Sequence, residues 1–335
     1  MPLSKKRSNG ITDSDRVTNT KQKENKKVIR EILEQYGFPL VGFLNVTDAS
    51  FDDWITPWLE KNFHADMAWM EKHGEIRSHP GKIFPESKSI IVIGLPYYTS
   101  PPATWTKENP ISCFAWGEDY HVIIKKKMKA AINELSKVFP DLQARGFVDS
   151  APVPEKILGA RAGLGWIGKN SLLINEKYGS FFFLGEIFTN LTLESDNPVG
   201  EHCGSCNKCV EWCPNHAIQS VGALQGMVDS NKCISWLTIE KKESFHENEE
   251  SLIQYQLFGC DICQQICPWN QKLDPQNESP FVCAPKWTNL KVSDYLKMTE
   301  EQFAVLKQKS PLKRAGLSGL QRNARIVLKN QNKKD

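Results

Sequence analysis

Apolar residues along the first two hundred positions follow two different periods. A period near 3.6 residues predicts amphipathic helices, whereas short apolar or alternating runs predict strands. Gly37 follows the first helical pattern, at a position where glycine commonly ends a helix. The predicted helices cover residues 28–36 and 122–139, and the predicted strands cover 40–44, 88–98, 144–148 and a strand pair within 179–191. This alternation predicts an α/β or α+β sheet domain.

Composition is that of an ordinary globular protein. At 335 residues, with 40% hydrophobic and 24% charged side chains, the chain can form one large core and a smaller module. No apolar stretch approaches the length of a membrane span, and residues 1–15 lack the apolar segment of a signal peptide. We therefore expect a cytoplasmic protein without a membrane partner. Its ten cysteines are then more consistent with metal binding or thiol chemistry than with disulfides.

Charge is unevenly distributed along the chain. Residues 1–30 carry nine Lys or Arg against three Asp or Glu, residues 286–335 carry twelve against four, and the middle has a net charge of −11. We interpret residues 1–25 as a disordered tail. Residues 310–330 mix basic positions with periodic apolar ones, which predicts an ordered element with a cationic face. Such a face favours a polyanion such as RNA as the partner.

Four cysteines fall within eleven residues in the segment CGSCNKCVEWCP (203–214). The spacing C-x2-C-x2-C-x3-C-P is that of bacterial ferredoxins, in which three thiolates bind one 4Fe–4S cluster and the fourth binds a second. Zinc is the alternative, but zinc sites usually take two separated pairs of ligands. A second run, CDICQQICP (260–268), favours two clusters.

The second run carries only three cysteines, because Leu257 stands where the first would be. Aligning the two runs assigns one complete cluster to Cys203, Cys206, Cys209 and Cys267. The same alignment leaves the other cluster with three ligands, Cys213, Cys260 and Cys263. Cys233, which lies between the runs, is the predicted fourth ligand. Cys283 and an open iron position are the alternatives.

A glycine-rich segment resembles a nucleotide loop only in its spacing. Gly163, Gly165 and Gly168 give G-x-G-x-x-G, yet a helical pattern precedes them and a strand pattern follows. A dinucleotide fingerprint needs the opposite order, so we discount NAD binding. We expect these glycines to let the backbone pass close to a large flat ligand.

These motifs, in this order, resemble the epoxyqueuosine reductase family. The resemblance rests on residues 148–191, both cysteine runs, CISWLTIEKKES (233–244) and LKRAGLSGLQRNARIVLKN (312–330), and it covers about residues 28–330. It implies an α+β protein. The expected parts are a corrinoid-binding sheet domain over 26–195, of reductive-dehalogenase/nitroreductase type, a ferredoxin-like two-cluster domain over 196–285 and a basic helical C-terminal segment over 286–335.

The resemblance also implies an activity. The family reduces the epoxide of epoxyqueuosine to queuosine at the wobble position of tRNAs with a GUN anticodon. Electrons would pass from a low-potential donor, not identified by the sequence, through two 4Fe–4S clusters to cobalamin. The alternatives are a reductive dehalogenase-like reductase of a small molecule and an electron-transfer ferredoxin with an extra domain. A dehalogenase usually carries a twin-arginine export signal and has no use for the basic C-terminal segment.

Asp149, in FVDSAPVPE (147–155), matches the family's proton donor. Opening an epoxide needs an acid for the leaving oxygen, and we expect a raised pKa that keeps this carboxyl protonated near neutrality. The alternative role for Asp149 is to cap the turn before Pro152. By resemblance, the cobalamin-contact positions are Arg77, Cys113, Asp149, Lys169, Ser171, Ser235 and Asp261.

The resemblance implies base-off cobalamin without a protein ligand to cobalt. DYHVII (119–124) begins like the D-x-H-x-x-G motif whose histidine binds cobalt, but Ile124 replaces the glycine. His121 is therefore expected to be a structural or lining residue, and Cys113 to pack near the corrin.

The tRNA is expected to bind across the cationic C-terminal face. Single-stranded bases of the anticodon loop would supply specificity, and basic side chains would contact phosphates. The predicted contacts are Lys313, Arg314, Arg322 and Arg325. The alternative for Arg322 and Arg325 is that they cap and solvate a terminal helix packed on the cluster domain.

Overall fold

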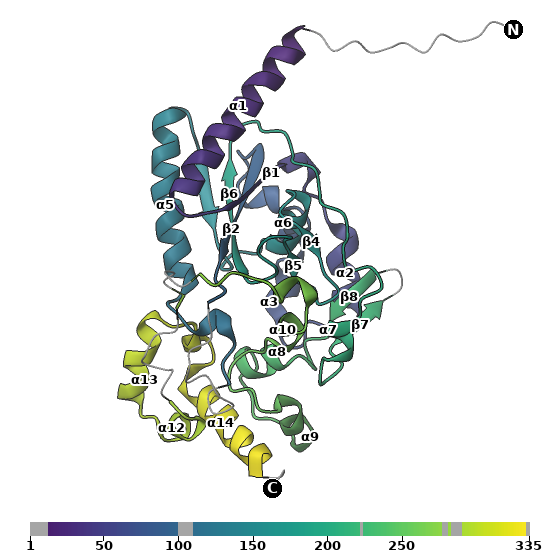
Figure 1. The fold of residues 1–335 in the computed structure, drawn as a ribbon, viewed down its shortest axis with the longest axis vertical. Coiled ribbons are helices and arrows are strands. Elements are labelled where there is room, and N and C mark those ends of the chain that lie inside the picture. The colour runs from purple at the N-terminus through teal and green to yellow at the C-terminus, as the bar shows by residue number, and fades with distance from the viewer. Residues whose placement is uncertain (1–12, 100–109, 222–223, 277–280, 283–289, 333–335) are drawn as a thin grey trace, which may run out of the picture.

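A computed structural model describes residues 13–99, 110–221, 224–276, 281–282 and 290–332. Its centre is an antiparallel sheet in the order β1-β2-β6-β3 (Figure 1). The strands are β1 (Leu40–Asn45), β2 (Ser89–Pro96), β3 (Ala144–Phe147) and β6 (Phe182–Thr189). The three pairings within this sheet are all antiparallel and join strands that are distant in the sequence, which places the domain in the predicted α+β class.

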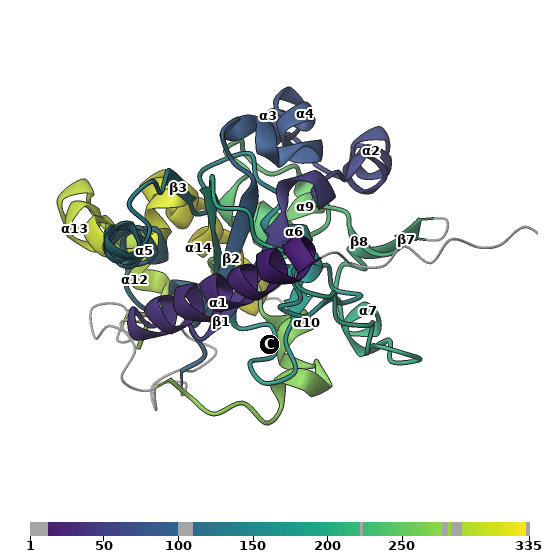
Figure 2. The same cartoon turned by 90° about the horizontal axis from the view of Figure 1, so that it is seen from above.

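Helices cover both faces of this sheet. On one face α1 (Asp13–Gln35) and α5 (Tyr120–Val138) pack together beside β1 and β3, as the two views show (Figures 1 and 2). On the other face α6 (Glu155–Arg161) packs against β1, β2 and β6. Residues 13–25, expected to be part of a disordered tail, belong to α1; residues 1–12 lie outside the described part of the chain.

The strand pair predicted within 179–191 is wrong, because β6 is one continuous strand. Every residue from Phe182 to Thr189 has a partner on β2, and Gly185 pairs with Ile93 rather than forming a turn. A side chain at Gly185 would come within 3.2 Å of Val148 Cγ2, so glycine here serves close packing.

Shorter elements complete the chain. Between β1 and β2 lie α2 (Asp52–Glu60), α3 (Ala68–Lys72) and α4 (Gly74–Ser78). After α6 come the hairpin β4 (Trp166–Ile167) and β5 (Leu173–Ile174), then α7 (Lys208–Glu211), β7 (Ile218–Val221), β8 (Leu224–Val228), α8 (Ile234–Ile239), α9 (Glu247–Glu250) and α10 (Ile262–Gln265). The C-terminal helices are α12 (Val292–Lys297), α13 (Glu300–Leu306) and α14 (Gly316–Asn332).

Short 3₁₀ turns link several of these elements. They are η1 (Val46–Asp48), η2 (Pro80–Ile83), η3 (Cys113–Ala115), η4 (Ser251–Ile253), η5 (Pro268–Asn270), η6 (Lys307–Lys309) and η7 (Pro311–Arg314).

One hydrophobic core joins all three segments named from the sequence. It runs from Ile29 on α1 through Phe183 on β6 to Leu257 in the cluster region and Val327 on α14. The Asn323 amide on α14 donates to the carbonyls of Thr238 (2.8 Å) and Leu257 (2.9 Å). The C-terminal segment is thus a packed part of the fold, as its apolar period predicts. None of the described helices is both long and apolar enough to cross a membrane.

The glycine-rich segment follows α6, as predicted, but β4 lies within it, between Gly165 and Gly168, and β5 comes after it. The expectation that its glycines face a large ligand is wrong, because protein atoms fill the space, backbone beside Gly163 and Gly165 and side chains beside Gly168. A Cβ on Gly165 would lie 2.0 Å from the Ile174 carbonyl oxygen, and one on Gly163 would lie 2.6 Å from the Asn197 carbonyl oxygen. These glycines permit close backbone packing instead.

Candidate active site

A cavity of about 1390 Å³ lies where the sheet domain, the cysteine-rich region and the C-terminal segment meet. Its walls come from α2 to α4, the loop from Asp149 to α6, the hairpin loop at Ser171, the cysteine loops and Arg314. This volume exceeds the roughly 300–1,000 Å³ of sites for drug-sized ligands. The cavity therefore has room for a large organic group.

Asp149 projects into this cavity from the loop between β3 and α6. Its side chain is 54% exposed, and its backbone adopts a left-handed conformation with φ +43°, which is unusual outside glycine. The Tyr120 hydroxyl donates to Asp149 Oδ2, and His121 Nε2 lies 3.2 Å from the same oxygen. The Asp149 N–H donates to Glu155 Oε1 at 2.6 Å. These contacts hold a strained residue in one orientation.

The expectation of a raised pKa at Asp149 is not met in this structure. Although burial opposes ionisation, hydrogen bonds from His121 and Tyr120 lower the pKa of this carboxyl. Burial likewise opposes the charge on His121, but hydrogen bonds to Asp119 and Asp149 raise the pKa of His121 to about 9. Near neutral pH the proton therefore resides on the imidazole, next to the carboxylate.

His121 has no free nitrogen with which to bind a metal. Its Nδ1 lies 2.7 Å from Asp119 Oδ1, and its Nε2 faces Asp149. Asp119, only 2% exposed, caps the first turn of α5 and is also ion-paired with Lys313. This agrees with the expected structural or lining role of His121.

The predicted ligands of the first cluster line one small cavity of about 240 Å³: Cys203, Cys206, Cys209 and Cys267. Burial, followed by the neighbouring Cys203 and Cys267 thiols, raises the pKa of Cys209 to about 11. The first three cysteines of the first run and the last cysteine of the second run are therefore neighbours, as the aligned motifs require.

The four predicted ligands of the other cluster line the large cavity: Cys213, Cys233, Cys260 and Cys263. Burial and Asp261, then the Cys233 and Cys213 thiols, raise the pKa of Cys260 to about 12. Leu257 is fully buried in the core, so a cysteine there would face apolar side chains. Cys233 stands instead at the start of α8. Cys283 lies outside the described residues.

No three His, Cys, Asp or Glu side chains within the described ranges converge on a single metal ion. The grouping of the thiols into two fours is a looser arrangement, and it supports the predicted division of cluster ligands without testing each ligand.

Five of the seven predicted cobalamin-contact residues line the large cavity: Arg77, Asp149, Ser171, Ser235 and Asp261. Arg77 Nε is buried and has no hydrogen-bond partner among the described residues. Lys169 lies instead at the smaller cavity, where its Nζ donates to the Gly204 carbonyl (2.8 Å) and to Asn207 Oδ1 (2.9 Å).

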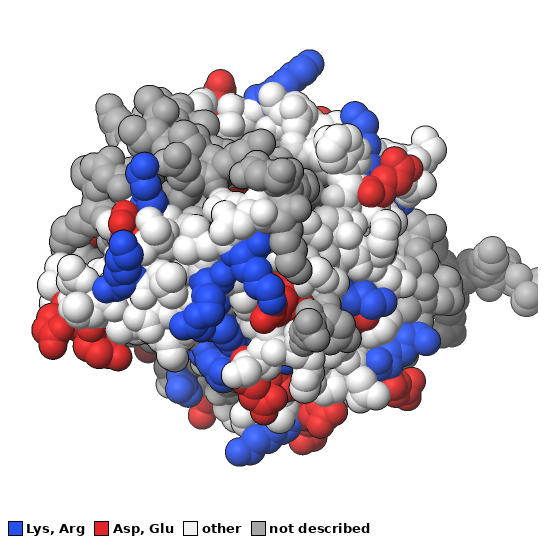
Figure 3. Space-filling view, turned by 90° about the horizontal axis from the view of Figure 1, so that it is seen from below, with Lys and Arg blue, Asp and Glu red and all other residues white. Residues whose placement is uncertain are grey.

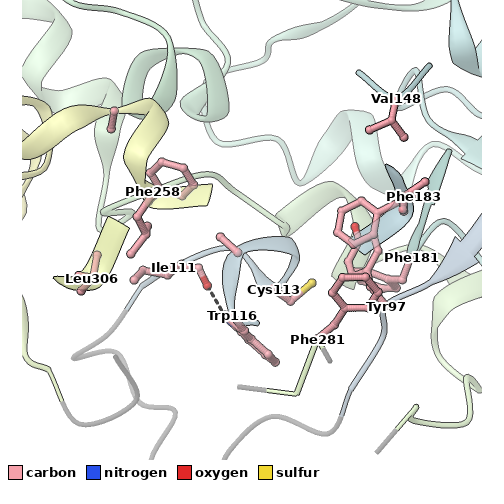
Figure 4. Close-up of a cluster of buried hydrophobic side chains, with 14 of the residues drawn as sticks. Tyr97, Ile111, Cys113, Trp116, Val148, Phe181, Phe183, Phe258, Phe281 and Leu306 are labelled. Atoms are coloured by element: carbon pink, nitrogen blue, oxygen red, sulfur yellow. Dashed lines mark hydrogen bonds between the residues drawn. The ribbon is translucent and has the colours of Figure 1, made fainter. Parts of the chain in front are cut away.

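Cys113 sits behind the large cavity rather than in its wall. In Figure 4 it lies near Tyr97 and Phe281 within the hydrophobic core, and its backbone N–H donates to Asp261 Oδ2 at 2.7 Å. Burial raises the pKa of the Cys113 thiol well above its usual value. This agrees with packing rather than with a reactive thiol.

Basic side chains gather on the face formed by the C-terminal segment, interspersed with acidic ones (Figure 3). Arg314 is paired with Glu240 at 2.7 Å, and its guanidinium lies 5.5 Å from the Trp69 ring centre at the cavity wall. Lys242, whose side chain is exposed, donates to the Arg314 carbonyl at 2.5 Å. Arg325 is also exposed.

Arg322 fits the alternative to an RNA contact, in which it belongs to a terminal helix packed on the cluster domain. Its guanidinium donates to the carbonyls of Lys241 (2.8 Å) and Glu243 (2.7 Å), and it lies 4.3 Å from the Phe245 ring centre. These groups are used inside the protein, so we remove Arg322 from the predicted RNA contacts.

Several residues at the site were missed in the sequence. Tyr120, Glu155, Trp69 and Lys242 line the cavity, yet each lies in a pattern that also suits an ordinary surface or core position. Glu186 offered a signal, because it is a lone charged residue within the apolar run FFFLGEIF.

Comparison with known proteins agrees with this arrangement. Residues 77–150 match a family model described as "Epoxyqueuosine reductase QueG, DUF1730", and residues 202–270 match a "4Fe-4S double cluster binding domain". An epoxyqueuosine reductase of Leadbetterella byssophila is 39% identical over 306 residues, which is 90% of this chain and 97% of that protein. The chain belongs to the epoxyqueuosine reductase family. It is therefore an oxidoreductase with an iron–sulfur domain, which excludes the reading as a plain electron-transfer ferredoxin.

Other epoxyqueuosine reductases extend the match. The Escherichia coli protein is 34% identical over 301 residues, 88% of this chain and 78% of that one. The structure of the Streptococcus thermophilus reductase superposes with a TM-score of 0.78 at 28% identity, covering 91% of this chain and 81% of that one. An epoxyqueuosine reductase solved with an epoxyqueuosine-modified tRNA-Tyr stem loop gives a TM-score of 0.82 at 26% identity, with coverage of 92% and 82%.

Proposed function

We propose that this protein reduces epoxyqueuosine in tRNA to queuosine, with two 4Fe–4S clusters feeding electrons to cobalamin and Asp149 donating a proton. One observation carries the proposal. The large cavity is lined on one side by Cys213, Cys233, Cys260 and Cys263 and on another by the carboxyl of Asp149. A reductive site needs both an electron source and an acid facing the same space.

The residues of the cavity fit cobalamin in its base-off form. The volume is large enough for a macrocycle, and Arg77 Nε is a buried donor without a partner among the described residues. His121 is engaged through both nitrogens, so it leaves cobalt without a protein ligand. Arg77, Ser171, Ser235 and Asp261 would hold the group. When bound and reduced, cobalamin supplies a strong carbon-directed reductant, while the protein positions it.

The two sets of thiols suggest the direction of electron flow. Cys203 and Cys206 precede α7 and Cys209 lies within it, and this segment has exposed neighbours such as Lys208 and Trp212. The other set faces the large cavity. Electrons from a low-potential donor would therefore enter at the first set and leave from the second.

Asp149 is placed to pass a proton from the protonated His121 to the substrate. Its carboxyl faces the cavity, while Tyr120 and the protonated His121 contact Oδ2. A leaving epoxide oxygen gains negative charge as its bond to carbon breaks. The proton shared between His121 and Asp149 would neutralise this charge, and the fixed loop conformation keeps the carboxyl aimed at it.

The substrate proposed is a tRNA with a GUN anticodon, supported by the relative solved with a modified stem loop. Lys242 and Arg314 bring positive charge to the cavity wall, and the C-terminal segment adds the exposed Lys313 and, further along α14, Arg325. Trp69, 40% exposed beside Arg314, offers a flat ring for an unstacked base. A tRNA substrate would place the reaction in the cytoplasm.

The test is conversion by the reconstituted protein. The protein is loaded with iron, sulfide and cobalamin under anaerobic conditions, reduced chemically and incubated with epoxyqueuosine-tRNA. Nucleosides from the digested tRNA are then analysed by mass spectrometry, and the expected product has lost one oxygen atom. Unchanged epoxyqueuosine, from protein that demonstrably holds both clusters and cobalamin, would contradict the proposal.

A further inference from the structure

Glu186 occupies an unusual place for a charged residue, the middle of the central strand β6. Alternation along the strand puts its side chain on the same face as Leu184 and Phe188, between Val92 of β2 and Phe147 of β3. The residue is completely buried, and no N–H or hydroxyl donor among the described residues reaches either carboxyl oxygen. An ionised carboxyl left alone in such surroundings is very costly, so Glu186 must hold or share a proton.

Glu155 supplies the partner. It is the first residue of α6, which packs against β6, and its carboxyl acts directly on that of Glu186; two carboxyls can share a hydrogen bond only if one of them is protonated. Its other contact is with the catalytic loop, since Glu155 Oε1 accepts from the Asp149 N–H at 2.6 Å. Unlike Glu186, Glu155 lines the large cavity. The pair therefore connects a buried position on the central sheet with the large cavity.

The surroundings favour the protonated form of this pair. Burial, followed by the charge of Asp149, raises the pKa of Glu155 to about 8, and burial together with Glu155 raises the pKa of Glu186 well above its usual value. The charged or titratable groups that act on the pair come from four elements: Arg77 of α4, Tyr120 and His121 of α5, Asp149 of the loop after β3, and Lys156 of α6.

The proposed reaction needs two protons. Epoxyqueuosine carries one oxygen more than queuosine, so returning it to queuosine breaks two C–O bonds and releases that oxygen as water. The balance is two electrons from the external low-potential donor and two protons from the protein. The His121–Asp149 pair accounts for one proton. A second source must face the same cavity.

We propose that Glu155 and Glu186 form a proton store that supplies the second proton of each turnover. Glu155 releases the proton into the cavity, either to the leaving oxygen or to the Asp149 carboxylate. Glu186 acts through Glu155: it is a positioning residue that keeps a proton in the pair and shares it by the carboxyl–carboxyl hydrogen bond. The pair then regains its proton from solvent through the cavity. This inference rests on the proposed function.

The test compares four proteins, each reconstituted with both clusters and cobalamin: wild type, Glu186→Gln, Glu186→Asp and Asp196→Asn. Glutamine has the size of glutamate but holds no titratable proton, whereas aspartate keeps one. Asp196→Asn is the matched control, a carboxyl-to-amide change outside the cavity that removes ion pairs to Lys26 (2.5 Å) and Arg30 (2.7 Å) of α1. It reports the effect of a weakened fold alone.

Single-turnover rates on epoxyqueuosine-tRNA are measured from about pH 6 to 9. We expect the wild-type rate to fall as the pH rises through about 8, where Glu155 loses its proton. Glu186→Gln should be slower by about 10²-fold or more and should lose this dependence, since loss of a positioned proton source typically costs about 10²–10⁴ in rate. Glu186→Asp should recover much of the rate. Asp196→Asn should lower only the melting temperature.

A second readout does not depend on turnover. The infrared carbonyl band of a protonated carboxyl should be present in wild type near neutral pH and reduced in Glu186→Gln but not in Asp196→Asn. A wild-type pH profile in Glu186→Gln, or an unchanged band, would overturn the proton store. Wild-type protein that fails to convert epoxyqueuosine would instead contradict the proposed function, so the two failures are distinguishable.

Discussion

His121 Nε2 lies 3.2 Å from Asp149 Oδ2 and joins the first turn of α5 to the loop that faces the cavity. The same imidazole lies 2.7 Å from Asp119 through Nδ1, and Asp119 is ion-paired with Lys313 from the C-terminal segment. A basic residue predicted to bind RNA thus contributes to the electrostatics around the Asp149 loop. Binding of tRNA phosphates near Lys313 and protonation at Asp149 are therefore expected to be coupled.

Asp149→Asn should retain both clusters and bind cobalamin, because the amide has the same shape. It should lower the rate of epoxide reduction by about 10²–10⁴, the usual cost of removing a positioned acid. Single-turnover assays with epoxyqueuosine-tRNA measure this loss, and cobalamin absorbance checks loading. Asp196→Asn serves as the control for a carboxyl-to-amide change. Wild-type turnover in Asp149→Asn would contradict the assignment.

His121→Gln should change how stability depends on pH. The pKa of His121 is raised to about 9 in the folded state, above the value of about 6.5 for an unfolded histidine. Its stabilising contribution is therefore complete below pH ~6.5 and is lost as the pH rises through about 9. Melting temperatures across this range should fall more steeply for wild type than for the variant. Parallel curves would show that the imidazole is not charged in the folded protein.

Cys233→Ser should remove one cluster and leave the other intact. Cys233 lines the large cavity with Cys213, Cys260 and Cys263, whereas the remaining four motif cysteines line the smaller cavity. Iron should fall from about eight to about four per chain after anaerobic reconstitution. Cys113→Ser is the control, because that thiol lines neither cavity. Eight iron in Cys233→Ser would point to Cys283 or to an open iron position.

Trp69→Ala should weaken tRNA binding without changing its salt dependence. Loss of a stacked base typically costs about 1–3 kcal/mol, and the substitution removes no charge. A double alanine variant of Lys242 and Arg314 should instead reduce the slope of log affinity against log salt by about 0.7–0.9 for each phosphate that the variant no longer neutralises.

The control for both tRNA variants is Lys137→Ala. Lys137 is exposed in the last turn of α5, about 26 Å along the helix from Tyr120 at the cavity. The tRNA affinity of Lys137→Ala, and the dependence of that affinity on salt, should match those of wild type. Equal binding by Trp69→Ala and wild type would remove this ring from the tRNA site.

Gly165→Ala should destabilise the hairpin that supports the cavity. The added methyl group would lie 2.0 Å from the Ile174 carbonyl oxygen, which belongs to the rigid backbone of β5. Overpacking of this kind typically costs about 1–3 kcal/mol. Gly200→Ala is the control, since nothing lies within 4 Å of that position. Equal urea midpoints for the two variants would show that the hairpin moves to accept the methyl group.

The sequence alone determined the features that depend on near neighbours in the chain. Cysteine spacing indicates clusters because thiolates a few residues apart must share one side of a turn, and the shortened second run requires a ligand from elsewhere. Apolar period located the last part of α1 together with β1, β2, α5 and α14, since burying one face of an element imposes that period. The strand pair predicted within 179–191 failed because only the pairing with β2 shows that one strand runs unbroken through Gly185.

Tertiary structure decided the chemistry of the site. Glu155 and Glu186 are 31 positions apart and Asp119 and Lys313 are 194 apart, so no local pattern reveals that they meet. A pKa depends on burial and on the charges that packing brings close. The sequence does not show that His121 lies beside Asp149, so Asp149 was expected to hold its proton, whereas in the structure the proton resides on His121. The basic pattern of residues 310–330 predicts that Arg322 contacts RNA. Packing of α14 on the cluster region instead directs its guanidinium toward backbone carbonyls. The grouping of cysteines a few residues apart follows from the covalent geometry of the chain. Protonation states and ion pairs instead depend on which distant segments pack together and exclude water from the groups between them.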